Sequence, residues 1–360
     1  MRVVVAPDSF KGTVSARDAA LALAAGWRSV RPDDELLIRP MADGGEGTLD
    51  ALAAALPGAV LHPVPGCTGP DGRPVTGRYA LLPDGTALVE LADTGGLPLL
   101  GGDLAPLTAG TRGTGETIAA ALDAGARRVT VALGGSASTD GGAGLLAALG
   151  LRLLDDTGAP LPDGGGALPR ADRLDRTALR TAPPGGVRLL TDVTNPLLGP
   201  TGAAAVYGPQ KGADPAAIAL LEAGLRRFAG LLGGDPSLPG SGAAGGTAYG
   251  LVAAWGARVV PGAAAVAELT GLDSALAGAD LVITGEGRFD TTSLLGKAVG
   301  EVLARAHRAA VATRIVAGES TDPGALTLVH LAGDPADARA RAPHWLTTAG
   351  ARLACAHPTD

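Results

Sequence analysis

The sequence has 360 residues, of which 46% are hydrophobic and 18% charged, a balance that argues against disorder and provides for a sizeable core. The formal net charge of −7 disfavours nucleic-acid binding, and two distant cysteines with five scattered histidines disfavour a disulfide framework or a zinc site. Because neither a signal-peptide pattern nor an apolar run of membrane-spanning length is present, we expect a soluble cytoplasmic protein that does not bind membranes.

The first sixty residues alternate strand and helix patterns. A β-branched run at Val3–Val5 predicts a buried parallel strand, and Ser15 is placed to cap a helix that reaches about Val30. Residues 35–39 predict a second strand, and a glycine-rich turn leads into a helix that ends near Leu56. This βαβα order is typical of the start of a doubly wound α/β domain.

Residues 60–92 have a different pattern, in which three short β segments are separated by Gly, Pro and Asp turns. This pattern predicts a β meander. Residues 155–186 are rich in Gly, Pro and Asp and predict connecting loops. Between and beyond these regions we expect strands at 128–133 and 188–192 and helices at 115–125, 141–149, 215–232 and 243–255.

The C-terminal part returns to the pattern of the first sixty residues. Segments 281–284, 298–309, 313–317 and 328–331 restore the alternation of strands and helices, and 335–339 reads as a loop. The simplest organisation is one α/β domain made from residues 1–60 and 270–360. A second domain with antiparallel strands, residues 61–269, would interrupt it.

Lysine, asparagine and glutamine are rare in this chain. Only three of the 29 basic residues are lysine, and each lysine adjoins a glycine; there is a single asparagine and a single glutamine. In a composition rich in Ala, Gly and Arg, we expect such residues to persist mainly where their chemistry is needed. They are Lys11, Lys211, Lys297, Asn195 and Gln210.

Six polar, glycine-rich segments follow predicted strands or precede predicted helices, where backbone N–H groups and helix dipoles can bind anions. They are 7–12, 42–48, 134–144, 191–196, 207–212 and 283–297. Their carboxylates, lysines, hydroxyls and glycines indicate phosphoryl transfer from a magnesium nucleotide, which depends on charge neutralisation and positioning. Simpler alternatives stay open, such as a turn with a solvated lysine at 7–12 and an acidic helix start at 42–48. No GxGxxG follows a strand, which disfavours a nicotinamide-dependent dehydrogenase.

Taken together, these segments resemble the bacterial-type glycerate kinase family. The matching motifs are Ala6–Gly12, Ala42–Thr48, Gly134–Ala137, Asp140–Gly144, Asn195–Pro200, Gly208–Ala213 and Ile283–Arg288. The resemblance implies ATP- and Mg²⁺-dependent phosphorylation of D-glycerate, with 2-phosphoglycerate favoured over 3-phosphoglycerate. It also implies a Rossmann-like parallel-sheet domain interrupted by an inserted α/β domain with a mixed sheet, and an active site in the cleft between them.

We expect the site residues to fall into four groups. Asp192 is the candidate base, Asp290 is its rival, and Lys11 and Lys297 are expected to neutralise the transferring phosphate oxygens. The substrate-binding candidates are Asp8, Ser9, Asn195, Glu286 and Arg288, of which Arg288 would bind the carboxylate. The nucleotide-binding candidates are Gly134, Gly135, Ser136, Asp140, Gly141, Gly142 and Lys211. The candidate Mg²⁺ ligands are Asp43 and Glu46, with Asp8 and Glu286 as further candidates for Mg²⁺ or hydroxyl contacts.

Two other functions remain open from the residues alone. One is a kinase for another small hydroxy acid or sugar acid, because Lys11 and Arg288 would suit any small carboxylate. The other is a non-catalytic two-domain protein that binds a small acid. The expected ligands are a small acid and a nucleotide; a homodimer is a candidate assembly.

Overall fold

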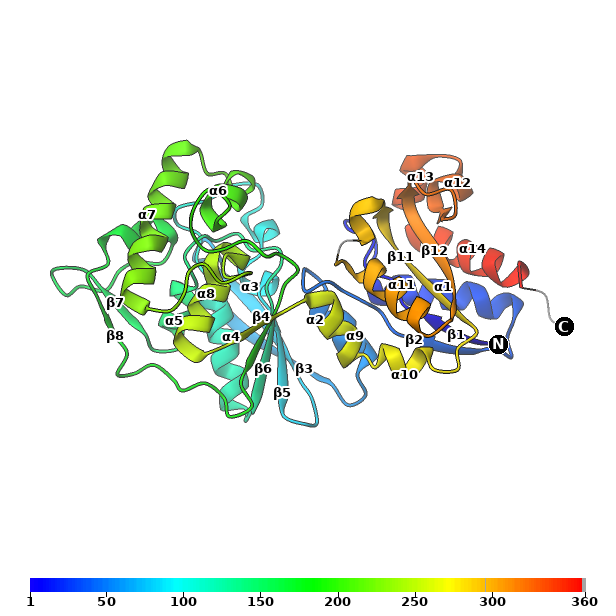
Figure 1. Ribbon diagram of the computed structural model, residues 1–360, viewed down its shortest axis with the longest axis horizontal. Helices are drawn as coiled ribbons and strands as arrows, with labels where there is room; N and C mark the ends of the chain where they lie inside the picture. Colours follow the sequence, from blue (N-terminus) through cyan, green and yellow to red (C-terminus); the bar gives the residue numbers. More distant parts are fainter. Residues whose placement is uncertain (295, 358–360) are drawn as a thin grey trace. The chain divides into compact units, whose positions relative to one another are not determined.

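The computed structural model describes residues 1–294 and 296–357, and the chain forms two compact units (Figure 1). Unit 1 comprises Met1–Asp43, Asp50–Pro57 and Pro261–Asp360, and unit 2 comprises Gly44–Leu49 and Gly58–Val260. Unit 1 has a parallel sheet and unit 2 a mixed sheet, so the predicted fold class is confirmed. Within the described ranges, no helix is long and apolar enough to cross a membrane.

The sheet of unit 1 is parallel throughout and has the strand order β13-β12-β11-β1-β2. The strands are β1 (Arg2–Val5), β2 (Glu35–Ile38), β11 (Leu281–Phe289), β12 (Ala312–Ser320) and β13 (Leu326–Thr327). From β1 the chain passes through a helix to β2 on one side, and from β11 it passes through a helix to β12 on the other. The junction of β1 and β11 is therefore a topological switch point, where α/β sheets bind their ligands at the carboxyl ends of the strands.

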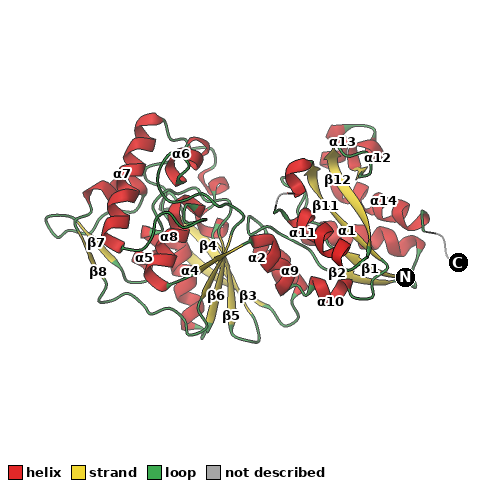
Figure 2. Ribbon diagram, in the orientation of Figure 1, coloured by secondary structure: helices red, strands yellow, loops and turns green. Residues whose placement is uncertain are grey.

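Helices lie on both sides of the unit 1 strands (Figure 2). Their bounds are α1 (Ala16–Val30), α2 (Thr48–Ala55), α9 (Gly262–Leu269), α10 (Leu272–Leu276), α11 (Ala298–Arg308), α12 (Leu328–Ala332), α13 (Pro335–Ala340) and α14 (Ala342–Cys355). Ser15 caps α1 as predicted, because its hydroxyl accepts a hydrogen bond from the Asp18 amide. Close packing of α1 on α14 explains Gly26, where a Cβ would lie 1.9 Å from the Thr347 carbonyl oxygen.

Unit 2 contains a six-stranded mixed sheet of order β10-β9-β6-β5-β4-β3 and a separate two-stranded sheet. The strands are β3 (Val60–Thr68), β4 (Pro74–Leu81), β5 (Thr86–Glu90), β6 (Arg128–Ala132), β7 (Arg152–Leu154), β8 (Arg173–Asp175), β9 (Val187–Leu190) and β10 (Arg258–Val260). Because β3, β4 and β5 pair antiparallel in sequence order, the predicted meander is confirmed. The remaining pairs of the large sheet are parallel.

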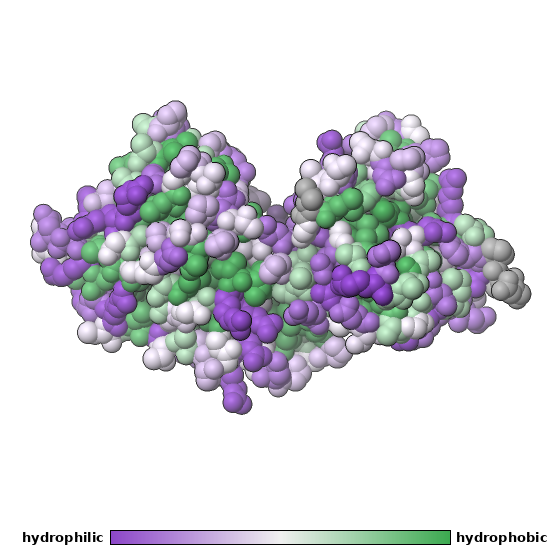
Figure 3. All heavy atoms as spheres, viewed as in Figure 1, coloured by the Kyte–Doolittle hydropathy of each residue, from purple (hydrophilic) through white to green (hydrophobic). Residues whose placement is uncertain are grey.

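The helices of unit 2 enclose a core that includes Leu145, Leu225, Phe228 and Tyr249. They are α3 (Ala92–Gly95), α4 (Arg112–Asp123), α5 (Ala143–Ala148), α6 (Ala203–Tyr207), α7 (Pro215–Leu232) and α8 (Ala243–Trp255). On the visible face of this unit, hydrophobic residues are interspersed with hydrophilic ones (Figure 3).

Two predicted loops are wrong because they contain regular structure. Residues 155–186 include β8, which pairs antiparallel with β7, and a 3₁₀ helix at Gly165–Arg170. Residues 335–339 belong to α13, in which Asp334 accepts a hydrogen bond from the Asp337 amide and Pro335 occupies the first turn. An aspartate cap followed by proline is a helix-start signal, and reading the two residues as turn formers obscured it.

Candidate active site

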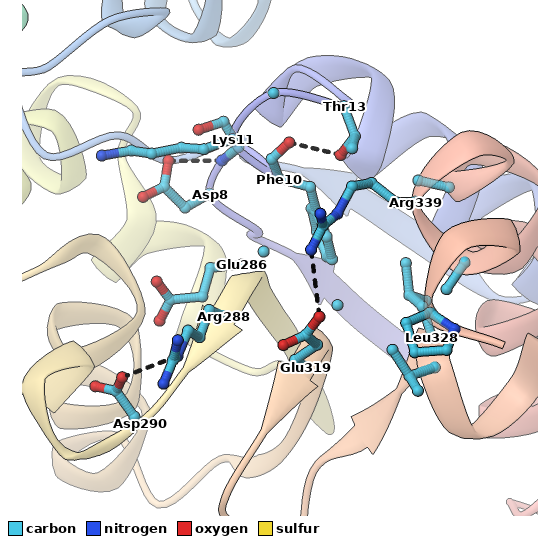
Figure 4. A pocket seen from close by; sticks show the side chains of 18 of the residues that line it. Asp8, Phe10, Lys11, Thr13, Glu286, Arg288, Asp290, Glu319, Leu328 and Arg339 are labelled. Atoms are coloured by element: carbon cyan, nitrogen blue, oxygen red, sulfur yellow. Dashed lines mark hydrogen bonds and ion pairs between the residues drawn. The ribbon is translucent and has the colours of Figure 1, made fainter.

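Unit 1 contains a cavity of about 550 Å³ at the switch point of its sheet (Figure 4). The loop after β1, the end of β11 and the segment before α11 all contribute to its lining. The sequence-predicted site residues that line it are Asp8, Ser9, Lys11, Asp43, Glu286, Arg288, Asp290 and Lys297. Segments separated by more than 240 positions in the sequence therefore meet around one space, which is the strongest indication of an active site in the described structure.

The loop after β1 is held against β11 by the backbone. The Asp8 amide donates to the Gly285 carbonyl oxygen at 2.8 Å, which continues the pairing of β1 and β11 beyond the strand end. Phe10 is buried and exchanges backbone hydrogen bonds with Val14, so residues 10–14 form a tight turn that presents Lys11 to solvent. The packing of Phe10 thus fixes where the Lys11 side chain begins.

Asp8 has an unusual protonation equilibrium. One of its carboxylate oxygens accepts a 2.6 Å hydrogen bond from the Ser9 amide. Burial, followed by the negative charges of Asp43 and Glu286, raises the pKa of Asp8 to about 7, while the Ser9 amide and the charge of Lys11 act in the opposite direction. A carboxyl group that titrates near neutral pH can both accept and return a proton, as acid–base catalysis requires.

Glu286 contributes a second perturbed carboxylate. Its side chain is only 9% exposed, and its Oε1 atom is buried without a hydrogen-bond partner among the described residues. Burial raises the pKa of Glu286, opposed by a hydrogen bond from Ser293 and by the charge of Lys297. Because an unpaired buried carboxylate oxygen costs free energy, its position in the cavity wall indicates that a ligand completes its contacts.

Asp290 is engaged in the structure of its own loop. Its Oδ1 atom accepts hydrogen bonds from the amide and hydroxyl of Thr292, and its Oδ2 atom lies 3.5 Å from the Arg288 guanidinium. The hydrogen bonds from Thr292 lower the pKa of Asp290, with a smaller contribution from Arg288. These contacts weigh against Asp290 as a proton acceptor and favour a role in holding Arg288, whose side chain is largely exposed.

The glycine-rich loop after β6 in unit 2 packs against residues 44–49. The Gly134 amide donates to the Gly44 carbonyl oxygen, and a Cβ at Gly134 would lie 2.4 Å from the Gly45 Cα atom. Glu90 fixes the same segment, because its carboxylate accepts from the amides of Gly47 at 2.8 Å and Leu49 at 2.9 Å. Gly135 is exposed and Ser136 is buried, whereas Glu46 is exposed within its own segment.

Asp140 organises the rest of this loop. It is fully buried, and its carboxylate accepts hydrogen bonds from the amides of Gly142 and Gly144 and from the amide and hydroxyl of Thr111. Gly141 and Gly142 have positive φ angles and pack closely against Phe228 and Thr247. These internal hydrogen bonds already use both carboxylate oxygens of Asp140. Direct contact between Asp140 and a nucleotide stays a prediction.

Lys211 is buried beside Asp140, with 3% of its surface exposed. Its ammonium group donates to the Ser138 carbonyl oxygen, and burial lowers the pKa of Lys211 to about 8 despite the nearby charge of Asp140. Lys211 therefore stabilises the loop backbone through this buried hydrogen bond. Its contact with a nucleotide stays a prediction.

The titration of Lys211 leads to a stability prediction. Between about pH 8 and its usual pKa of 10.5, the unfolded chain binds more protons at this site than the folded chain, so its contribution to stability rises with pH. We expect the melting temperature of the wild type, relative to Lys211→Met, to increase across this interval. Thermal unfolding of both proteins followed by circular dichroism from pH 7 to 10.5 measures this difference; a constant offset would contradict the buried titration.

The fourth predicted segment follows β9. Asp192 is half-buried at the strand end. The Asn195 amide nitrogen donates to the Thr201 carbonyl oxygen at 2.8 Å, and its oxygen accepts from the Tyr207 hydroxyl at 2.6 Å. Asn195 thus stabilises the loop that leads to α6, and its predicted contact with substrate stays a prediction.

The carboxylates of unit 1 are compatible with magnesium. Within residues 1–294 and 296–357, no group of three or more His, Cys, Asp and Glu side chains is arranged to hold a metal ion. Mg²⁺ usually takes only one or two protein carboxylates together with water and substrate phosphates. Asp43 lines the cavity that also contains the unpaired oxygen of Glu286, so the oxygen donors present suit that mode of binding.

Comparisons with known proteins give a consistent result. The model of the glycerate kinase family matches residues 3–352. The glycerate kinase of Bacillus subtilis is 43% identical over 305 residues, covering 82% of this chain and 79% of the relative. The glycerate 2-kinase of Escherichia coli is 39% identical over 333 residues, covering 89% and 86%. A crystal structure assigned to glycerate kinase 2 of Salmonella typhimurium LT2 is 37% identical, has a TM-score of 0.85 and covers 99% of both chains.

Proposed function

Since the chain belongs to the glycerate kinase family and is an enzyme of that kind, we propose that it transfers the γ-phosphoryl group of ATP to D-glycerate and forms 2-phosphoglycerate. The observation that carries this proposal is the convergence of eight predicted site residues, including two of the three lysines, on one cavity at the switch point of unit 1. The name of the Escherichia coli relative, glycerate 2-kinase, supports the choice of product.

The cavity supplies the charges that phosphoryl transfer needs. We propose that Lys11 and Lys297 neutralise oxygens of the transferring group and that Arg288 binds the glycerate carboxylate with its planar fork. Ser9 and Glu286 would contact the substrate hydroxyls. Asp290 would hold Arg288 in position through the ion pair described above.

The proton acceptor is proposed to be Asp192, and the structure adds Asp8 as an alternative. Asp8 lines the cavity and has a pKa of about 7, which suits a group that accepts the proton of the attacking hydroxyl and releases it afterwards. Asp290 is the weakest of the three because its hydrogen bonds from Thr292 lower its pKa below the usual value, which makes it a poorer proton acceptor.

Asp43 and Glu46 are the proposed protein ligands of Mg²⁺. The ion, when bound, supplies positive charge to the phosphate oxygens of the nucleotide. Glycines 134, 135, 141 and 142 and Ser136 are proposed to form a loop that contacts the nucleotide phosphates. The amides of Gly134, Gly141 and Gly142 already donate within the protein, so these glycines would act by shaping the loop, with the exposed Gly135 nearest to solvent. In this loop, Asp140 and Lys211 would act by holding the backbone.

An assay of ADP formation tests the function directly. ADP release from MgATP is measured with and without D-glycerate, and the product is identified by ³¹P NMR. We expect ADP to accumulate only when D-glycerate is present and the new resonance to be that of 2-phosphoglycerate. ADP formation that D-glycerate does not stimulate would contradict the proposed reaction, and a 3-phosphoglycerate resonance would contradict the proposed product.

The role of Asp192 has its own test. We expect Asp192→Asn to lower kcat by about 10²–10⁴-fold, the range for loss of a general base, without a change in circular dichroism. Asp156→Asn, an exposed change in the same unit, is the matched control and should retain wild-type activity. A near wild-type rate for Asp192→Asn would transfer the role of proton acceptor to Asp8.

A further inference from the structure

The cavity of unit 1 continues beyond its charged residues to an apolar end that the proposed chemistry does not use. Side chains from α12, α13 and the start of α14 form the walls of this apolar end. The residues are Leu328, Val329, Pro335, Ala338 and Ala342. A cavity of about 550 Å³ lies in the range that holds drug-sized molecules. A three-carbon acid at the charged end would leave this apolar part unfilled, so the space is suited to a larger ligand.

An exposed ion pair lies beside the apolar end. The Nη2 atom of Arg339 lies 3.3 Å from the Oε1 atom of Glu319, and the two side chains are 72% and 49% exposed. An ion pair this exposed contributes little to stability. Figure 4 shows the Arg339 side chain reaching over the cavity between Thr13 and Glu319. A guanidinium plane can stack on a flat ring, and a carboxylate can accept a hydrogen bond from an exocyclic amine.

We propose that the apolar end binds the adenine ring of the phosphoryl donor, with Arg339 stacked on the ring and Glu319 facing its polar edge. This proposal rests on the glycerate kinase function proposed above. A nucleotide has a flat, weakly polar ring at one end and anionic phosphates at the other. The cavity has the complementary division, with apolar walls from α12–α14 at one end and, at the other, Lys11 and Lys297 beside carboxylates such as Asp43 that would take up Mg²⁺ with the phosphates. Its position at the switch point of a parallel sheet is one where such ligands bind.

Two substitutions in the apolar end test the proposal, each with a matched control. Val329→Trp fills the cavity, whereas His330→Trp places the same side chain at an exposed neighbouring position outside it. Arg339→Ala removes the guanidinium over the cavity, whereas Arg341→Ala removes one that packs on Trp345. KM for ATP, KM for D-glycerate and kcat are measured for all four variants, and ADP binding without glycerate is measured by calorimetry.

We expect Val329→Trp to raise KM for ATP and the Kd of ADP about tenfold or more and Arg339→Ala to raise both about threefold to tenfold. KM for D-glycerate should stay at the wild-type value in both variants, and the two controls should match the wild type. Unchanged ADP binding in both cavity variants, or a rise in KM for D-glycerate instead of ATP, would overturn the adenine assignment and leave the kinase function standing. If the wild type shows no glycerate-dependent activity, ADP calorimetry still decides the adenine site separately.

Discussion

Asp8→Asn should strongly reduce phosphorylation of D-glycerate, because Asp8 is a proposed substrate contact as well as the alternative proton acceptor to Asp192. The same substitution should make the protein more stable at and above pH 7. The pKa of Asp8 rises from 3.8 to about 7 because the carboxyl is buried and lies near Asp43 and Glu286. Between these values the folded protein binds more protons at Asp8 than the unfolded chain, so the contribution of Asp8 to stability falls as pH rises through this range. Above pH 7 the folded protein holds an unfavourable charge that asparagine lacks.

The gain in stability should be on the order of 2–4 kcal/mol above pH 7 and should disappear below about pH 4. Urea unfolding of wild type and Asp8→Asn at pH 4, 6 and 8 measures it. Asp33→Asn, an exposed change in the same unit, is the control and should change neither activity nor stability. A fully active Asp8→Asn enzyme would remove Asp8 from the proposed chemistry, and a variant less stable than the wild type at pH 8 would contradict the unfavourable buried charge. Stability that is lost to retain an activity is typical of functional sites.

Lys11→Ala should lower kcat by about 10²–10³-fold, as expected for the loss of a group that stabilises charge in the transition state. The tight turn at residues 10–14 is held by backbone hydrogen bonds and by the buried ring of Phe10, so removal of the exposed Lys11 side chain should leave the fold unchanged. Lys11→Arg should recover only part of the activity, because a guanidinium presents its charge as a planar fork rather than as a compact point.

Lys11 also lowers the pKa of Asp8, so its removal should affect the pH dependence of any remaining activity. In Lys11→Ala, the acidic limb of kcat/KM should move to higher pH, and the steady-state rate between pH 5.5 and 9 measures this shift. Arg17→Ala removes one exposed positive charge from α1 and serves as the control for net charge. A wild-type kcat in Lys11→Ala would remove Lys11 from the proposed chemistry.

The sequence allowed the elements around the cavity to be predicted because their signals are local. The β-branched run of β1, the Ser15 cap of α1 and the turn-separated segments of the meander depend on neighbouring residues. The rarity of lysine in this chain was a second signal of the site, since two of the three lysines, Lys11 and Lys297, line the cavity. That Asp8 and Glu286 line one cavity could be expected because both follow strands predicted to be parallel neighbours. The structure extends β11 to Phe289, so Glu286 lies within this strand, beyond the end of its pairing with β1.

Other features depend on packing between distant segments and could not be predicted. Glu90 resembles any polar residue in a strand, yet it binds the backbone of residues 47–49. Asp140 and Lys211 carry the charges of a nucleotide site, but tertiary packing buries both and directs them to the loop backbone. The helix α14 is absent from the sequence-based expectations. It packs on α1, and this contact joins segments from opposite ends of the chain that only the folded structure brings together.

The most direct test of the unit 1 cavity as the active site is the rate of D-glycerate-dependent ADP formation by wild type and Asp8→Asn at equal protein concentration. We expect the wild type to form ADP only when D-glycerate is present and Asp8→Asn, folded and at least as stable at pH 8, to form almost none. Equal rates for the two proteins would show that the reaction does not depend on Asp8 and would contradict its place in the proposed active site.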